Sequence, residues 1–221
     1  MYTGNIIFDM DGTLWDSSEN VAASWTSTIR RSGVSVLRNM VLTRADIQGI
    51  MGLAMDEIAA KLFPDLSPTR RAAVLDACTE DENNYLAVNG GVLYDNEEEI
   101  LERLTDGRRL FIVSNCQCGY IEAFFEYTGF ERFFSDYLCW GDTLKPKGET
   151  IKRLIEKNNC VNSVYVGDTR GDYLAALSAG IPFIHAAYGF GKLLSGDTPA
   201  EVISSLAELD DKALPFRNRG N

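Results

Sequence analysis

The carboxylates best placed to do chemistry come directly after a short apolar run near the start of the chain. Asp9 and Asp11 follow residues 6–8, Ile-Ile-Phe, which are typical of a buried strand. Two close carboxylates repel each other, and burying either one is costly. In open α/β sheets, ligands bind just outside the carboxyl ends of the strands. We therefore expect this pair to bind a cation at a strand end.

Further polar groups follow two later apolar runs or occupy one loop. They are Ser114 and Asn115, Asp168 and Asp172, and the lysines Lys145 and Lys147. Taken singly, each has a plainer interpretation as a turn, a helix cap or a solvated helix entry. Because the carboxyl ends of parallel strands lie at one edge of a sheet, we expect the groups that end the strands to meet the first aspartate pair there.

Strand and helix alternate along the chain except in one all-helical stretch. Between residues 17 and 88, helices are expected over 16–32, after Thr43, over 55–62 and from Ser67 onward. Elsewhere, strands are expected over 110–113, 137–140, 164–166 and 181–184, with helices over 96–105, 120–127, 149–158, 172–179 and 199–206. Pro182 indicates an edge position for the last strand, and the tail from Asp210 is expected to be loosely ordered.

This alternation predicts an α/β fold with a doubly wound, mostly parallel, Rossmann-like sheet, interrupted after its first strand by an all-helical insert. The expected boundaries place residues 1–15 and 91–221 in the core and residues 16–90 in the insert. Interrupted cores of this kind form clefts between domains, where small-molecule sites are common.

Taken together and in this order, the polar groups resemble the four signature motifs of the haloacid dehalogenase-like superfamily. The motifs are DxDGT at residues 9–13, an apolar strand ending in Ser114, a lysine, and GDxxxD at residues 167–172. The resemblance covers nearly the whole chain. The helical insert is similar to the α-helical cap domain of the phosphoglycolate phosphatase-like branch, so the resemblance implies a Mg²⁺-dependent phosphatase.

The resemblance also implies a role for each residue. Asp9 would be the nucleophile that forms a phospho-aspartate, and Asp11 would protonate the leaving group and then activate water. Presence of the second aspartate favours phosphoryl chemistry over dehalogenation, because a halide leaving group needs no proton. The implied Mg²⁺ ligands are Asp9, Asp11 through its backbone carbonyl, Asp168 and Asp172.

Ser114, Asn115 and one lysine would hold the remaining phosphate oxygens. The lysine has two candidates. Lys145 matches a family pattern of Lys-Pro-x-Pro in which Gly148 replaces the second proline, whereas Lys147 matches relatives with Lys-Gly-Glu at the helix entry. We favour Lys147 because it directly abuts the expected helix.

The composition limits the classes of partner. A formal charge of −11 argues against a protein that binds nucleic acid or an anionic membrane. A signal peptide is not expected, because the predicted strand begins at residue 6, and no apolar run approaches membrane-spanning length. The 5 cysteines lack a paired framework and are expected to be reduced thiols of a cytoplasmic protein. The expected partner is a small phosphorylated metabolite, bound by a monomer or homodimer.

Several residues keep two interpretations. In the insert, Arg44, Gln48 and Met51 are either substrate contacts or ordinary surface, whereas Trp15 and Trp25 are expected to pack in the hinge or core. For three further features we favour a structural role over a functional alternative. The alternatives are a pH switch at His185, a nucleotide-binding loop at Gly189-x-Gly191 and a metal or redox site at Cys116-x-Cys118.

Two rival functions remain open from the sequence. A sugar phosphomutase would carry the same motifs but return the phosphate to its substrate instead of releasing it. A non-catalytic phosphoester-binding protein on the same scaffold would bind without turnover. Presence of both Asp9 and Asp11 favours an enzyme.

Overall fold

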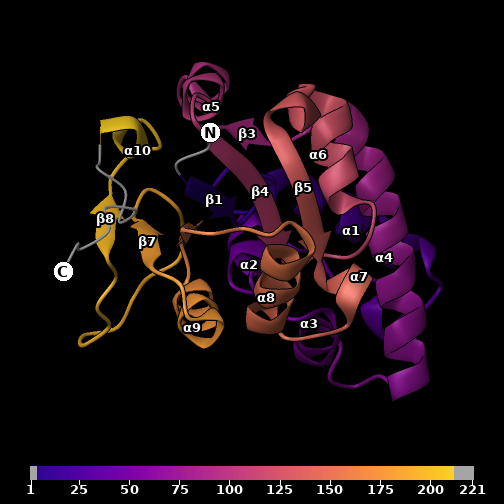
Figure 1. Ribbon diagram of the computed structural model, residues 1–221. Helices are drawn as coiled ribbons and strands as arrows, with labels where there is room; N and C mark the ends of the chain where they lie inside the picture. The colour runs from indigo at the N-terminus through magenta and orange to yellow at the C-terminus, as the bar shows by residue number, and fades with distance from the viewer. Residues whose placement is uncertain (1–3, 212–221) are drawn as a thin grey trace.

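A single parallel sheet lies at the centre of the molecule (Figure 1). The computed structural model describes residues 4–211 of the chain. The strands of its 6-stranded sheet, in spatial order, are β5 (Phe134–Cys139), β4 (Arg108–Ser114), β1 (Gly4–Phe8), β6 (Ser163–Gly167), β7 (Phe183–Ala186) and β8 (Glu201–Ile203). Every neighbouring pair is parallel. In this order β1 lies near the middle of the sheet, between β4 and β6.

Helices cover both faces of this sheet. Successive side chains of each strand point to opposite faces, so each strand contributes to two cores. In β1, Ile6 and Phe8 point into one core with α5 (Glu97–Leu104) and α6 (Tyr120–Thr128). Ile7 points into a second core with α8 (Lys147–Lys157) and α9 (Arg170–Ala179). The predicted doubly wound α/β fold is confirmed.

The stretch after the first strand is helical. Its elements are α1 (Ser18–Arg31), the 3₁₀ helix η1 (Ser35–Leu37), α2 (Arg44–Gln48), α3 (Met55–Leu62) and α4 (Pro68–Asn89). We call residues 18–89 the helical insert. Helix α4 packs against α1 within the insert and against α6, which lies beside it in Figure 1, so the insert contacts the rest of the molecule along its longest helix.

A small element that the sequence analysis missed connects the insert to the sheet domain. Strand β2 (Trp15–Asp16) pairs antiparallel with β3 (Val92–Leu93), one on each side of the insert. Gly91 permits the close approach, since a Cβ there would lie 2.9 Å from Cε3 of Trp15. This ribbon falls at the predicted domain boundaries, and the division into two domains stays a prediction.

The end of the sheet differs from the sequence analysis in two ways. Pro182 lies just before β7 instead of inside it, and β7 is an internal strand. The missing N–H of proline therefore removes no ladder hydrogen bond, while the Pro182 carbonyl accepts from Tyr165 N. The helix expected over 199–206 is also wrong: residues 201–203 form β8, whose pairing with β7 outweighs the local pattern.

Smaller elements complete the chain. They are η2 (Phe130–Phe133), α7 (Trp140–Thr143) and α10 (Glu208–Asp211). Strand β5 begins earlier than expected, and Trp140 already belongs to α7. Most of the tail expected to be loosely ordered, residues 212–221, lies outside the described residues.

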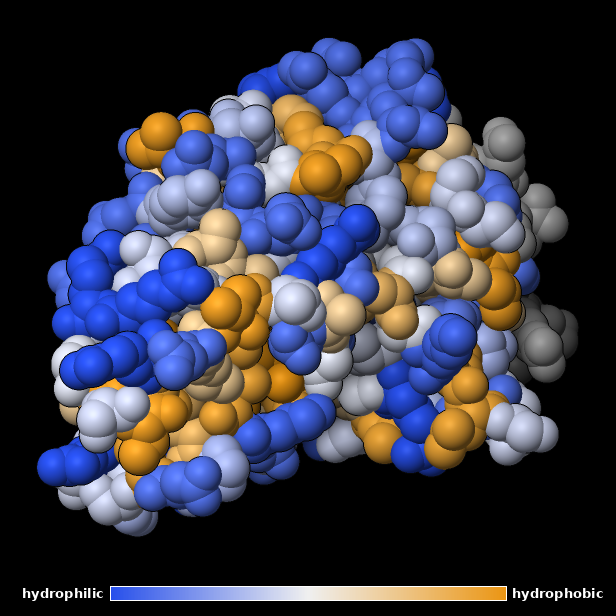
Figure 2. Space-filling view, turned by 180° about the vertical axis from the view of Figure 1, so that it is seen from behind, coloured by the Kyte–Doolittle hydropathy of each residue, from blue (hydrophilic) through white to orange (hydrophobic). Residues whose placement is uncertain are grey.

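The face opposite to that of Figure 1 is mixed in character. Figure 2 shows hydrophilic and apolar side chains interspersed over this face, with several apolar ones gathered at its lower left. None of the helices described between residues 4 and 211 combines the length and the hydropathy required to cross a bilayer.

Candidate active site

The three strands at the centre of the sheet end in polar groups, as the sequence predicts. Asp9 follows β1, Asp168 follows β6, and Ser114 is the last residue of β4. Because β1 lies between the other two strands, Asp9 occupies the middle of this edge. Asp9 is buried, with 3% of the residue exposed, and Ser114 and Asp168 are buried too.

Three buried carboxylates form a compact group there. One oxygen each from Asp9, Asp168 and Asp172 lie within 4.8 Å of one another. Lys147 Nζ donates to Asp9 Oδ1 at 2.9 Å and to Asp172 Oδ1 at 2.6 Å, and its side chain is buried. Lys145, the other candidate lysine, is exposed. The structure thus brings Lys147 into the group and leaves Lys145 outside.

The charges in this group do not balance. Burial and then the nearby Asp172 raise the pKa of Asp9 to about 7, despite the Lys147 ammonium. Burial, with Asp172 and Asp9, likewise raises the pKa of Asp168 to about 8. Burial lowers the pKa of Lys147, but Asp172 and Asp9 outweigh it and the net shift is upward. One ammonium is too little positive charge for these carboxylates, which favours a bound cation.

Asp168 shows where such a cation fits. Its Oδ2 accepts from the backbone N–H groups of Phe190, at 3.0 Å, and Gly191, at 2.7 Å. Its Oδ1 is buried and has no hydrogen-bond partner among the described residues. An unpaired buried oxygen is costly unless a ligand satisfies it. Carboxylate oxygens are the ligands that Mg²⁺ prefers, so these residues fit a Mg²⁺ ion.

The glycine pair Gly189-x-Gly191 supports Asp168 rather than a nucleotide. A Cβ at Gly189 would lie 2.4 Å from Cβ of Asp168, and one at Gly191 would lie 2.6 Å from its backbone oxygen. His185 is buried, and its Nε2–H donates to the same backbone oxygen at 3.0 Å. The loop and the histidine therefore fix the position of Asp168. The sequence showed the glycines but not what they contact.

Asp11 faces a different environment from Asp9. Its Oδ1 accepts from Tyr120 Oη at 2.6 Å and from Ser17 Oγ at 2.8 Å. Burial raises its pKa to about 6, although both hydrogen bonds act in the opposite direction. Sequence reasoning identified neither partner. Ser17 is the N-cap residue of α1, but its side chain makes no cap hydrogen bond there.

A pocket of about 520 Å³, counting the space that opens to solvent, lies between the helical insert and this edge of the sheet. Asp9, Asp11 and Ser114 line its floor, and apolar side chains from α1, α2 and α3 line much of the rest. Asn115 lines it too, and its Nδ2 donates to the backbone oxygen of Gly52 at 2.8 Å. This contact joins the insert to the strand ends.

The residues of the insert that the sequence analysis singled out divide between pocket and surface. Met51 lines the pocket. Arg44 and Gln48 do not, because both donate hydrogen bonds to Oδ2 of Asp16. Trp15 and Trp25 both pack in the core as expected, and Trp25 also lines the pocket.

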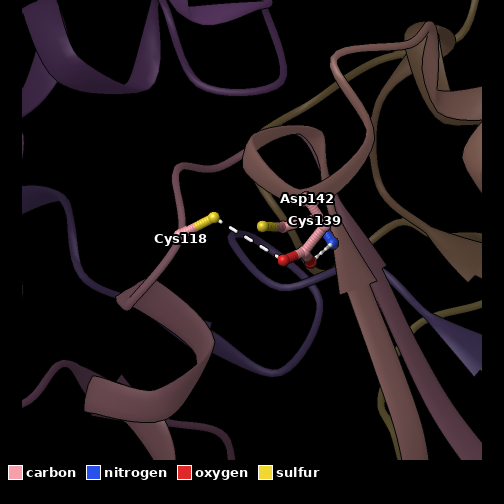
Figure 3. A group of neighbouring side chains, drawn as sticks. All are labelled: Cys118, Cys139 and Asp142. Carbon is pink, nitrogen blue, oxygen red and sulfur yellow. Dashed lines mark hydrogen bonds between the residues drawn. The ribbon is translucent and has the colours of Figure 1, made fainter.

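A group of thiols lies beside the site (Figure 3). Cys118 donates to Oδ1 of Asp142 at 3.6 Å, Cys139 N donates to Oδ2 of Asp142 at 2.8 Å, and the Sγ of Cys139 lies in the same group. Burial, then Cys139 and Asp142, raise the pKa of Cys118 to about 12. The Cys118 thiol therefore stays protonated, and its bond to Asp142 holds the loop after Asn115 against α7.

Comparison with known proteins identifies the family. Residues 6–186 match the haloacid dehalogenase-like hydrolases. The chain belongs to this family. It is 30% identical over 220 residues to a phosphoglycolate phosphatase of Vibrio parahaemolyticus, covering 92% of this chain and 93% of that protein. It is 31% identical over 222 residues to one of Vibrio vulnificus, covering 95% of each.

A solved structure shows the same fold. The crystal structure of a predicted phosphoglycolate phosphatase from Haemophilus somnus superposes with a TM-score of 0.79 at 21% identity, covering 95% of this chain and 97% of that one. The family match and the relatives confirm the predictions of a haloacid dehalogenase-like hydrolase, of its phosphoglycolate phosphatase-like branch, and of a phosphoric monoester hydrolase.

Proposed function

We propose that this hydrolase is a Mg²⁺-dependent phosphatase that cleaves a small phosphomonoester through a phospho-aspartate at Asp9. The observation that carries the proposal is the contrast between its two neighbouring carboxylates. Asp9 contacts Lys147 in the carboxylate group, whereas Asp11 accepts hydrogen bonds from Ser17 and Tyr120. Different environments for a pair of carboxylates are what separate nucleophile and acid–base roles.

The two carboxylates divide the chemistry. An oxygen of Asp9 forms a bond to phosphorus, and the bond from phosphorus to the ester oxygen breaks. Asp11 gives its proton to the departing alkoxide, since its raised pKa of about 6 keeps a larger fraction of it protonated near neutral pH than an ordinary aspartate would have. In the second step Asp11 takes a proton from water, which attacks phosphorus and frees Asp9 and inorganic phosphate.

The other residues orient the phosphate and hold the cation. Asp9, Asp168, Asp172 and the backbone carbonyl of Asp11 would hold Mg²⁺, which when bound stabilises negative charge on the phosphoryl oxygens. The Ser114 side chain, the Asn115 backbone N–H and Lys147 would hold those oxygens. Burial of Lys147 against Asp9 supports it over the exposed Lys145.

The substrate is a small phosphorylated metabolite, as expected for a pocket whose polar floor is formed by Asp9, Asp11 and Ser114. The chain's relatives are named for phosphoglycolate, which makes that compound the first to test. A cytoplasmic location and a monomeric or homodimeric state stay predictions.

Release of inorganic phosphate from a panel of small phosphoesters tests the proposal. We expect release that requires Mg²⁺ and disappears in Asp9→Asn, a variant that keeps the size of the side chain. A wild-type protein that binds Mg²⁺ and is folded but releases no phosphate from any ester would contradict it. Transfer of phosphate within a bisphosphate intermediate, without release, would instead identify a mutase.

A further inference from the structure

The pocket over Asp9 and Asp11 has to accommodate the leaving group of the substrate. It extends from the strand ends into the helical insert, where Trp25 and Met51 give it apolar walls. One ionisable side chain of the insert lines it: Glu82, from the middle of α4. This glutamate is only 4% exposed and has no part in the chemistry proposed above.

The carboxyl groups on the pocket wall have no cationic counterpart there. Asp9, Asp11 and Glu82 carry them, and no lysine, arginine or histidine lines the pocket within the described part of the chain. The cations nearby are engaged elsewhere, because Lys147 lies between two carboxylates of the metal group and Arg44 binds Asp16. A carboxylate on the leaving group would therefore enter the pocket without a cationic partner.

Glu82 is held in a defined orientation that leaves one oxygen available. Its Oε2 accepts from Trp25 Nε1 at 2.8 Å and from Gln117 Nε2 at 3.3 Å. Gln117 is itself fixed, since the same Nε2 donates to Asn83 Oδ1 at 2.8 Å. Among the described residues, no hydrogen bond goes to Oε1 of Glu82. Burial raises the pKa of Glu82 to about 8, so the side chain can donate or accept through this oxygen.

We propose that Glu82 is a specificity-determining residue that selects phosphoesters whose leaving group ends in a hydroxyl or ammonium group and disfavours those that end in a carboxylate. The inference rests on the proposed phosphatase activity. A hydroxyl or ammonium can bond to the available oxygen of Glu82, whereas a buried carboxylate loses its hydration without gaining an opposite charge. Glu82 brings no positive charge whether it is protonated or ionised.

Three two-carbon phosphoesters test the selection because they differ only in the terminal group. They are 2-hydroxyethyl phosphate, phosphoethanolamine and 2-phosphoglycolate. For the wild type, we expect kcat/KM for the hydroxyl and ammonium esters to exceed that for phosphoglycolate by about 10-fold, the effect of one well-formed hydrogen bond. The assay uses the full chain with Mg²⁺ at a single pH.

Two substitutions separate selection from catalysis. Glu82→Gln keeps an acceptor for Trp25 and the size of the side chain. We expect it to lower the ratio of kcat/KM for the ammonium ester to kcat/KM for phosphoglycolate by about 10-fold. Glu97→Gln is the matched control, because Glu97 is also a buried glutamate but lies on α5 and lines no part of this pocket. We expect it to leave the ratio of the three esters unchanged.

A fourth substrate, the generic phosphoester p-nitrophenyl phosphate, separates a failure of the proposed selection from a failure of the proposed phosphatase activity. If phosphoglycolate is the best of the three esters, or if Glu82→Gln shifts the ratio no more than Glu97→Gln does, the selection is refuted while the phosphatase stands. If the folded wild type hydrolyses none of the esters, p-nitrophenyl phosphate included, the phosphatase proposal fails and this inference fails with it.

Discussion

Replacement of Glu97 by glutamine should stabilise the protein in a way that depends on pH. Glu97 is 2% exposed at the start of α5, where its Oε2 accepts from Tyr94 N at 3.1 Å and its Oε1 has no partner among the described residues. Burial raises its pKa from 4.5 to about 8. Between these values the unfolded chain has released the proton and the folded chain still holds it, so raising the pH favours unfolding.

The size of the effect follows from the two pKa values. With one pKa unit equal to about 1.4 kcal/mol, this shift costs the folded state about 3 kcal/mol at pH 7 and about 1 kcal/mol at pH 5. Glutamine cannot ionise, so Glu97→Gln removes the cost at both values. We therefore expect the variant to gain about 2 kcal/mol more stability relative to wild type at pH 7 than at pH 5.

Urea unfolding of the wild type and of Glu97→Gln at pH 5 and pH 7 measures how the difference between their free energies of unfolding changes with pH. Other titrating groups, including Glu82, are common to both proteins and cancel in the comparison. The amide can still accept from Tyr94 N, so the backbone hydrogen bond is kept. An equal gain at the two pH values, or a larger gain at pH 5, would show that Glu97 is not a neutral buried carboxyl in the folded state.

Two further predictions concern the site. Lys147→Met should lower kcat/KM by at least about 100-fold, because it removes a donor to the phosphate oxygens, whereas Lys145→Met should change it by less than about 3-fold; similar losses in both would contradict the assignment. Gly191→Ala places a Cβ 2.6 Å from the backbone oxygen of Asp168, so it should raise the Mg²⁺ concentration for half-maximal activity by about 10-fold. Gly171→Ala, where the nearest atom lies 3.4 Å away, is the control, and equal effects would show that crowding of Asp168 is not the cause.

The sequence alone was sufficient for the core of the fold and for which residues meet at the strand ends. Apolar runs that end in Asp9, Ser114 and Asp168 are local patterns, and parallel pairing then requires their carboxyl ends to share one edge. For the same reason the doubly wound sheet follows from the alternation of strands and helices. The position of Lys147 next to a helix entry also indicated the lysine that the structure buries.

Local patterns failed at the far edge of the sheet. Residues 201–203 have no strong strand pattern of their own, and they form β8 because β7 offers an open edge. Pro182 suggested an edge strand, but its neighbour β7 begins one residue later and lies inside the sheet. Pairing between segments distant in the sequence decides such cases, and single-segment propensity does not contain it.

Only the tertiary structure decided what surrounds each carboxylate. Ser17 and Tyr120 come from separate helices to the side chain of Asp11, and the loop at Gly191 comes from beyond β7 to Asp168. Glu82 is an ordinary acidic residue of a long helix in the sequence, and packing of α4 against α1 turns it into a buried group of the pocket. Burial and contact are properties of the assembled chain, so the chemistry of the motifs is visible in the sequence while the surroundings that tune it are not.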